Sequence, residues 1–255
     1  MITNKAKMDK IPSRLLKVLK LACSSPINRL LDIGCGTGGY SILLKNNFGA
    51  REVYGIELSS VAVRNIKKKG KSIKVTRTDL NKDSLHYPEG YFDLVFAGEI
   101  IEHLILPDKL LDDIFRVLSP GGNLIITVPN IANWYCRLQL LMGYQPYSIP
   151  VSMKYRWVGA FCAKRREGGV TKRKYTMVNA QEGLDHVRFF TTKGICDLLK
   201  AHGFKIIEIK GTTTDEFAVK LPAIIRVLIK GFDNIMASIP GLASGVIINA
   251  KKHNN

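Results

Sequence analysis

Leu30-Leu31-Asp32-Ile33-Gly34-Cys35-Gly36-Thr37-Gly38-Gly39 is the stretch that decides the fold of this 255-residue chain. The apolar residues 29–33 predict a buried strand, and residues 39–47 have the pattern of a helix. The glycines between them let the backbone approach a ligand closely, and the first N–H groups of a helix are free donors. The stretch therefore predicts a nucleotide-binding loop between the first strand and a helix of an α/β domain.

Strand and helix patterns alternate along most of the chain. A mostly parallel sheet with helices on both faces is the usual result of such alternation. Ser59 is expected to cap one helix, Ser119 to Gly122 to end another and Gly203 to end a third. The predicted strands are 29–33, 52–56, 73–76, 92–97, 124–128, 204–210 and 245–250, and the predicted helices are 13–23, 39–47, 59–69, 108–118 and 191–202.

Two segments interrupt the alternation. Residues 130–185 are rich in aromatic and basic side chains and include the runs Lys164-Arg165-Arg166 and Lys172-Arg173-Lys174. Residues 217–240 are apolar with spaced basic residues, and such a segment can lie on an anionic membrane, form a dimer face or, more commonly, pack on the sheet edge. Long insertions in an α/β domain are often lids or substrate caps. We therefore expect one domain with an inserted lid or cap.

Composition limits the partners and the compartment. The formal net charge is +17, which predicts either attraction to a polyanion, such as RNA or an anionic membrane surface, or a solvated basic surface. The five cysteines are far apart and fit neither a disulfide framework nor a zinc site. No signal peptide or membrane span is apparent. We expect a cytoplasmic protein that can associate peripherally with a membrane.

The glycine loop alone does not identify its ligand. Gly34, Gly36 and Gly39 also fit the G-x-G-x-x-G pattern of dinucleotide enzymes, and Glu57 lies where a ribose-binding acid would follow. Asp32, however, places a carboxylate just before the first glycine. It would repel a pyrophosphate and attract the ammonium of a methionine moiety. After the third predicted strand, Asp79 could accept a hydrogen bond from an adenine amino group.

Together these residues resemble the class I S-adenosylmethionine-dependent methyltransferases. The resemblance spans the chain apart from the two insertions. It implies a Rossmann-like sheet of seven strands, mostly parallel with an antiparallel last strand, and the cofactor at the carboxyl ends of the strands. By the same resemblance, the residues that bind S-adenosylmethionine are Asp32, Gly34, Cys35, Gly36, Gly38, Glu57, Leu58, Asp79, Leu80 and Ala97.

A cluster of acids and imidazoles follows the fourth predicted strand. If the segment Glu99-Ile100-Ile101-Glu102-His103 is helical, its two glutamates and its histidine share one face. Two carboxylates and an imidazole suit a divalent metal, and His186, where the large insertion rejoins the core, offers a second imidazole. The alternative is that His103 only bonds the backbone or acts as a base without a metal.

This E-x-x-E-H segment resembles the ubiquinone-pathway O-methyltransferases and the enzymes that 2′-O-methylate small RNAs. The resemblance implies a metal held by Glu99, Glu102, His103 and His186, with catalytic roles for Glu99, His103 and His186. The implied activity is O-methylation of a hydroxyl on a small molecule, glycan or lipid precursor. RNA 2′-O-methylation is one alternative, and a non-catalytic adaptor that binds nucleic acid or membrane is another.

Overall fold

The computed structural model describes residues 12–21, 23, 26–68, 70, 72–146, 149, 151, 158–160, 186–214 and 223–253. The two predicted basic runs of the large insertion lie outside the described residues. Most of the predicted lid or cap is therefore also outside them.

The described part of the chain contains one seven-stranded sheet in the order β3-β2-β1-β4-β5-β7-β6. Strands β1 to β5 pair in parallel, and β7 is antiparallel to both of its neighbours, β5 and β6. This confirms the predicted sheet with its antiparallel last strand. The strands are β1 (Arg29–Ile33), β2 (Glu52–Glu57), β3 (Lys74–Arg77), β4 (Phe92–Gly98), β5 (Leu118–Pro129), β6 (Phe204–Thr212) and β7 (Gly245–Lys252).

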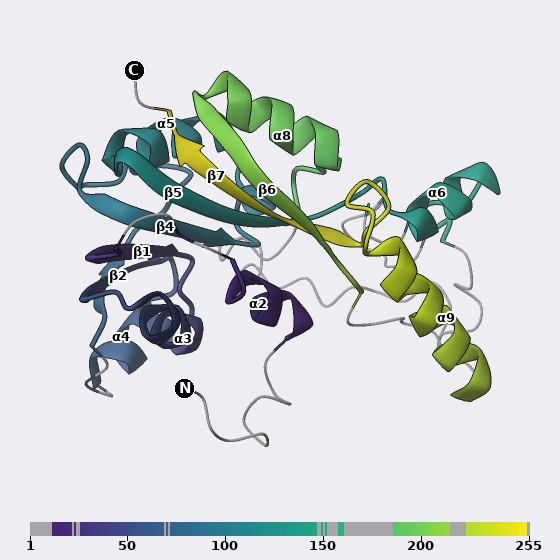
Figure 1. Cartoon of the computed structure of the whole chain (residues 1–255), viewed down its shortest axis with the longest axis horizontal. Helices are drawn as coiled ribbons and strands as arrows, with labels where there is room; N and C mark the ends of the chain where they lie inside the picture. The colour runs from purple at the N-terminus through teal and green to yellow at the C-terminus, as the bar shows by residue number, and fades with distance from the viewer. Residues whose placement is uncertain are drawn as a thin grey trace.

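Helices cover both faces of the sheet (Figure 1). On one face lie α5 (Pro107–Val117) and α8 (Thr192–Ala201), and on the other lie α2 (Ser13–Val18), α3 (Gly39–Phe48) and α4 (Ser60–Lys68). Each layer has its own apolar core against the sheet. Two further helices of the described residues, α6 (Trp134–Leu141) and α9 (Ala223–Met236), lie together at one end of the sheet.

Local chemistry fixes the ends of the helices where the sequence predicts it. The Ser59 hydroxyl accepts a hydrogen bond from the Ala62 N–H at 3.3 Å, and the Thr191 hydroxyl accepts one from the Gly194 N–H at 2.9 Å. Gly203 ends α8 with a φ of 85°, a left-handed conformation that glycine adopts readily.

Two predicted boundaries are wrong. The fifth strand was predicted to begin at residue 124, after a turn at 119–122, but it begins at Leu118. Leu118 already pairs with Phe92, and the register of the two strands then shifts through a bulge. The first helix ends at Val18 rather than Cys23. There the N–H groups of Lys20 and Leu21 bond to carbonyls three residues back, which tightens the chain into turns.

The large insertion leaves the core and rejoins it at neighbouring points. Asn130 and Phe190 form an isolated parallel bridge, and the Ile131 N–H donates to the Phe190 carbonyl at 2.9 Å. The two ends of the insertion are therefore tied to each other. Helix α6 begins just inside this junction, with the Asn133 side chain capping it by accepting from the Cys136 N–H.

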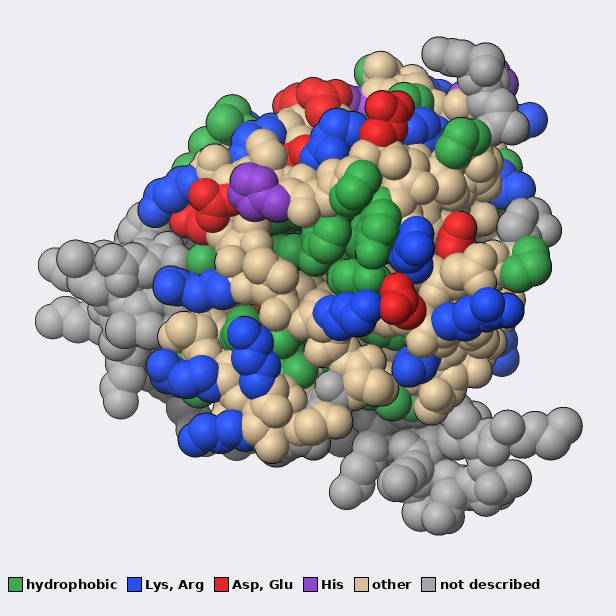
Figure 2. Space-filling view, turned by 90° about the vertical axis from the view of Figure 1, so that its left-hand side faces the viewer, with side chains coloured by type: hydrophobic (Ala, Val, Ile, Leu, Met, Phe, Trp, Pro, Cys, Tyr) green, Lys and Arg blue, Asp and Glu red, His purple; other side chains and the backbone are tan. Residues whose placement is uncertain are grey.

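The structure shows where the basic residues lie on one face and the state of four of the five cysteines. Figure 2 shows Lys and Arg side chains spread over the end of the sheet at which β7 finishes, with Asp and Glu among them and hydrophobic side chains near the centre. The positive charge on this face is therefore dispersed rather than gathered into one track. Cys23, Cys35, Cys136 and Cys196 are free thiols, and Cys162 lies outside the described residues.

Candidate functional site

The glycine-rich loop leaves β1 and is held by β2. The N–H groups of Gly34 and Cys35 both donate to the Ile56 carbonyl, at 2.8 and 3.0 Å. The Gly36 N–H donates to Oε2 of Glu57 at 2.8 Å. Helix α3 then starts after Gly38, which has no side chain to cap it, so the first-turn N–H groups are open to a ligand.

Gly34 and Gly36 are required for different reasons. Gly34 has a φ of +74°, and a Cβ there would lie 2.1 Å from Cδ1 of Ile100. Gly36 has a φ of +53°, but no atom lies within 4 Å of its would-be Cβ. Gly34 thus lets the segment after β4 pack onto the loop, whereas Gly36 leaves one side of the loop open for a ligand.

Asp32 ends up buried directly beneath this loop. Its side chain is only 2% exposed, and Oδ2 accepts a hydrogen bond from the hydroxyl of Ser41 on α3. The pKa of Asp32 is raised to about 7, because burial raises it more than the hydrogen bond from Ser41 lowers it, and the charge of Glu57 adds to the rise. Nothing in the sequence pattern pointed to Ser41 as the partner of this carboxylate.

The other predicted cofactor residues follow at the carboxyl ends of neighbouring strands. Glu57 Oε1 accepts from the Ser59 N–H at 2.8 Å. Asp79 accepts from the Asn81 N–H at 3.1 Å and pairs with Lys82 at 3.2 Å. The remaining members differ in burial: Cys35 and Ala97 are buried, and Leu58 and Leu80 are partly exposed.

The segment after β4 does not form the predicted single helical face. A short 3₁₀ helix, η1 (Ile101–His103), begins only after Glu99, whose φ is +55°. Glu99 points elsewhere: it pairs with Arg14 of α2 at 2.8 Å and accepts from the Thr127 hydroxyl at 3.0 Å. Sequence reasoning missed Arg14, because its partner lies far along the chain and no motif surrounds it.

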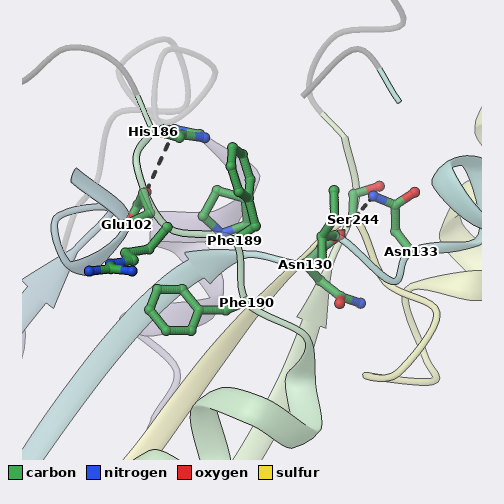
Figure 3. A pocket seen from close by; sticks show the side chains of 10 residues that line it. Glu102, Asn130, Asn133, His186, Phe189, Phe190 and Ser244 are labelled. Carbon is green, nitrogen blue, oxygen red and sulfur yellow. Dashed lines mark hydrogen bonds and ion pairs between the residues drawn. The ribbon is translucent and has the colours of Figure 1, made fainter. Parts of the chain in front are cut away.

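The structure instead brings three of the four predicted ligands together. One ligand atom each from Glu102, His103 and His186 lies within 4.8 Å of the others. Oε1 of Glu102 is 4.0 Å from Nε2 of both histidines, and the two rings meet edge to face at 4.8 Å. Figure 3 shows His186 directly above Glu102.

The backbone holds His186 in this place. The carbonyl of Glu102 accepts hydrogen bonds from the N–H groups of Val187 and Arg188, at 2.9 and 3.0 Å. The Arg188 side chain also donates to the Ile105 carbonyl at 2.6 Å. The end of the large insertion is therefore fastened to the η1 turn, next to the histidine that it carries.

Glu102 is an unusual glutamate. Its side chain is 1% exposed, and neither carboxylate oxygen has a hydrogen-bond partner among the described residues. The pKa of Glu102 is raised to about 8, because burial and then the charge of Glu99 raise it more than its own backbone N–H and Arg14 lower it. A buried carboxylate without a donor is costly unless something binds it. Two imidazoles and a carboxylate suit a divalent transition metal, so these residues fit such an ion.

A pocket of about 380 Å³, counted out to its open mouth, adjoins this cluster. Glu102 and His186 lie on one side of it, and Asn130, Asn133 and Ser244 lie on the other (Figure 3). The remaining lining residues are Pro129, Ile131, Arg188, Phe189 and Phe190. The pocket is thus a mixed apolar and polar space beside the cluster, at the carboxyl end of β5 and next to the ends of the insertion.

Known proteins resemble this chain over part of its length. It is 38% identical over 145 residues to the chloroplastic tocopherol O-methyltransferase of Arabidopsis thaliana, covering 54% of this chain and 40% of that one. It is 27% identical over 195 residues to a demethylmenaquinone methyltransferase of Listeria welshimeri, covering 70% and 79%. The chain spans less than two thirds of the length of the first of these relatives.

Solved structures share the fold. An S-adenosylmethionine-dependent methyltransferase from Mesorhizobium loti aligns with 93% of this chain and 95% of its own, with a TM-score of 0.56 and 19% identity. The model of the family described as "Methyltransferase domain" matches residues 4–209, which include the glycine loop, the acidic strand ends and the Glu102 cluster. With this sheet, this loop and this match, the chain belongs to the methyltransferase domain family, whose cofactor is S-adenosylmethionine.

Proposed function

We propose that this protein transfers the methyl group of S-adenosylmethionine to a hydroxyl oxygen of a small molecule or lipid precursor, beside a divalent cation. The observation that carries the proposal is the buried carboxylate of Glu102, without a hydrogen-bond donor among the described residues and facing two imidazoles. The name of the Arabidopsis relative includes O-methylation, which supports an oxygen acceptor.

The glycine loop and the strand ends suit the cofactor. The Asp32 carboxylate would accept from the ammonium of its methionine part, directly or through water. Glu57 would bind the ribose hydroxyls and Asp79 the adenine amino group. The open space beside Gly36 would let the cofactor lie against the loop. The cofactor supplies a methyl group on a sulfonium, which makes the carbon electrophilic.

Glu102, His103 and His186 would hold the cation. Nitrogen ligands favour an ion such as Mn²⁺ or Zn²⁺ over Mg²⁺, which prefers oxygen. When bound, such an ion supplies Lewis acidity that lowers the pKa of a hydroxyl. Glu99 is not placed as a fourth ligand in this proposal, because Arg14 and Thr127 bind its carboxylate.

The protein's own groups then account for the proton and the positioning. An acceptor in the pocket would present its hydroxyl to the cluster, and one of His103 and His186, released from the cation, would take the proton as general base. The oxygen forms a bond to the methyl carbon as the carbon–sulfur bond breaks, leaving a thioether. Because Ile100 packs on Gly34, the η1 turn that carries Glu102 and His103 follows directly from a segment in contact with the cofactor loop.

Transfer of labelled methyl groups to fractionated cell extract tests the proposal. Label should enter the small-molecule or lipid pool with the wild-type protein and not with Glu102→Gln or His186→Ala. The exposed Glu89→Gln is the matched control and should behave as wild type. Label found mainly in RNA would show that the acceptor is RNA rather than a small molecule or lipid. No label in any pool would favour a non-catalytic adaptor.

A further inference from the structure

Helices α6 and α9 form one unit at the end of the sheet (Figure 1). The indole N–H of Trp134 on α6 donates to Oδ1 of Asp233 on α9 at 2.8 Å. The rings of Trp134 and Phe232 pack edge to face at 5.0 Å. The Thr214 N–H donates to the other oxygen of Asp233 at 2.9 Å, which ties α9 to the end of β6.

Aliphatic side chains of this unit face solvent. Leu141 is 84% exposed, Ile224 73% and Val227 69%, values far above those of an ordinary packed helix. We call the exposed apolar residues of the unit the α6–α9 surface: Leu138, Leu140, Leu141, Met142, Ile224, Ile225, Val227, Leu228, Phe232, Ile235 and Ile239.

Helix α9 buries a charged residue and exposes its apolar residues, the reverse of a helix packed on a core. Among its described side chains the buried one is Asp233, an acid, whereas its isoleucines, valine and leucine are partly or largely exposed. Asp233 is buried because it serves as the anchor to α6 and β6. The sequence favoured packing of this segment on the sheet edge, and the structure instead leaves its apolar side outward.

The charged side chains that the structure exposes on these two helices are cations. Helix α6 contains Arg137 and no Asp or Glu. Residues 217–244 contain Lys220, Arg226 and Lys230, and their one acid is the buried Asp233. Arg137 and Lys230 are exposed beside the aliphatic residues. The surface therefore combines apolar side chains with cations and exposes no carboxylate from these two helices.

This combination selects one kind of partner. A second copy of the chain, meeting the same surface, would bring cations against cations without acids to pair them. Nucleic acid would use the cations but has no place for exposed leucines and isoleucines. An anionic bilayer accepts aliphatic side chains at its acyl boundary and cations at its headgroups.

We propose that the α6–α9 surface docks the protein on the surface of anionic lipid bilayers. The described residues contain no helix long and apolar enough to span a bilayer, so attachment would be in the interface. The pocket includes Asn133, which caps α6, and Ser244, which follows α9. Docking would thus bring the pocket mouth close to the lipid. This proposal does not depend on methyl transfer.

Sedimentation of the full chain with vesicles tests the proposal. Vesicles of equal phosphatidylcholine and phosphatidylglycerol should carry down the wild-type protein, and vesicles of phosphatidylcholine alone should carry down much less. The double variant Leu141→Asp/Val227→Asp should lower the partition coefficient on anionic vesicles by roughly tenfold or more. The control Val61→Asp/Ile207→Asp changes two other exposed apolar residues, on α4 and β6, and should sediment like wild type.

Three results would overturn the proposal. One is a wild-type protein that stays in solution with anionic vesicles. Another is equal sedimentation of the surface variant and the control variant. The third is a lipid-free dimer, detected by analytical ultracentrifugation, that the surface variant breaks while vesicles bind neither form. Binding of S-adenosylmethionine by each variant, measured by calorimetry, verifies that the fold is intact.

Discussion

Glu102 and His186 approach each other to 4.0 Å between Oε1 and Nε2, although the whole large insertion separates them in the chain. The same two positions are also joined through the backbone, because the Glu102 carbonyl binds the N–H groups that follow His186. The juxtaposition is therefore built into the fold, and a cation would meet ligands that are already in place.

Glu102→Gln should remove divalent cation binding. Calorimetry with Mn²⁺ or Zn²⁺ should give binding to the wild type and a loss of at least tenfold in affinity for the variant, since a neutral amide is a poor ligand. Glu89→Gln, which changes an exposed glutamate, should bind the ion as the wild type does. Equal ion binding by Glu102→Gln and wild type would exclude the metal site.

Asp32→Asn should weaken S-adenosylmethionine binding, and the wild type should bind it more tightly as the pH rises from 5.5 to 7.5. Across this window a carboxyl with a pKa of about 7 becomes charged, while the ammonium of the cofactor is still largely protonated. Calorimetry should show a gain of roughly tenfold for the wild type. The affinity of the variant should change little with pH. If the affinity of the variant rises as much as that of the wild type, a group other than Asp32 causes the pH dependence.

The same substitution should stabilise the protein without cofactor. The Asp32 carboxyl ionises near 3.8 when unfolded and near 7 when folded, so the native state binds more protons between those values. Its free energy of unfolding therefore falls as the pH rises through this window. Asn cannot ionise, and the melting temperature of Asp32→Asn relative to wild type should rise by at least ~3 °C from pH 4 to pH 7.5.

Gly34→Ala should destabilise the fold more than Gly36→Ala. Both glycines have positive φ, which costs an alanine about 1 kcal/mol, but only at position 34 does the new methyl group meet Ile100. Urea denaturation should show an additional loss of about 1–3 kcal/mol for Gly34→Ala. Adding Ile100→Ala should recover part of that additional loss. An equal loss of unfolding free energy at both glycines would mean that Ile100 moves away from the new methyl group at no cost.

Asp233→Ala should loosen the α6–α9 unit. It removes a buried acceptor for the Trp134 indole and the Thr214 N–H, which should cost about 2–4 kcal/mol of unfolding free energy. Hydrogen exchange should show faster exchange in α9 and unchanged exchange in β4. Asp197→Ala, on the exposed side of α8, is the control and should cost less than 1 kcal/mol.

The sheet could be read from the sequence because its signals are local. A buried strand before Gly34, the cap at Ser59 and the stop at Gly203 each depend on neighbouring residues. The assembly of Glu102, His103 and His186 followed from motif resemblance. The pairing of Arg14 with Glu99, and with it the loss of Glu99 from the predicted ligand set, depends on contacts between distant segments and left no pattern.

The outward face of α9 was also beyond sequence reasoning. Its apolar spacing is the same whether the helix packs on a sheet or faces a bilayer. What decides between them is the position of Asp233, because an anchoring acid on the inner side turns the isoleucines outward. That assignment requires Trp134 and Thr214, which come from two other elements.

The bridge between Asn130 and Phe190 has an evolutionary consequence. A loop whose two ends are bonded to each other can lengthen, shorten or exchange its contents without moving the strands that it joins, because the added entropy of closure grows only slowly with length. The residues between Asn130 and His186 can therefore diversify among descendants of one ancestor while the glycine loop and the Glu102 cluster, His186 included, stay fixed. New acceptors would then arise by replacing a module rather than by rebuilding the enzyme.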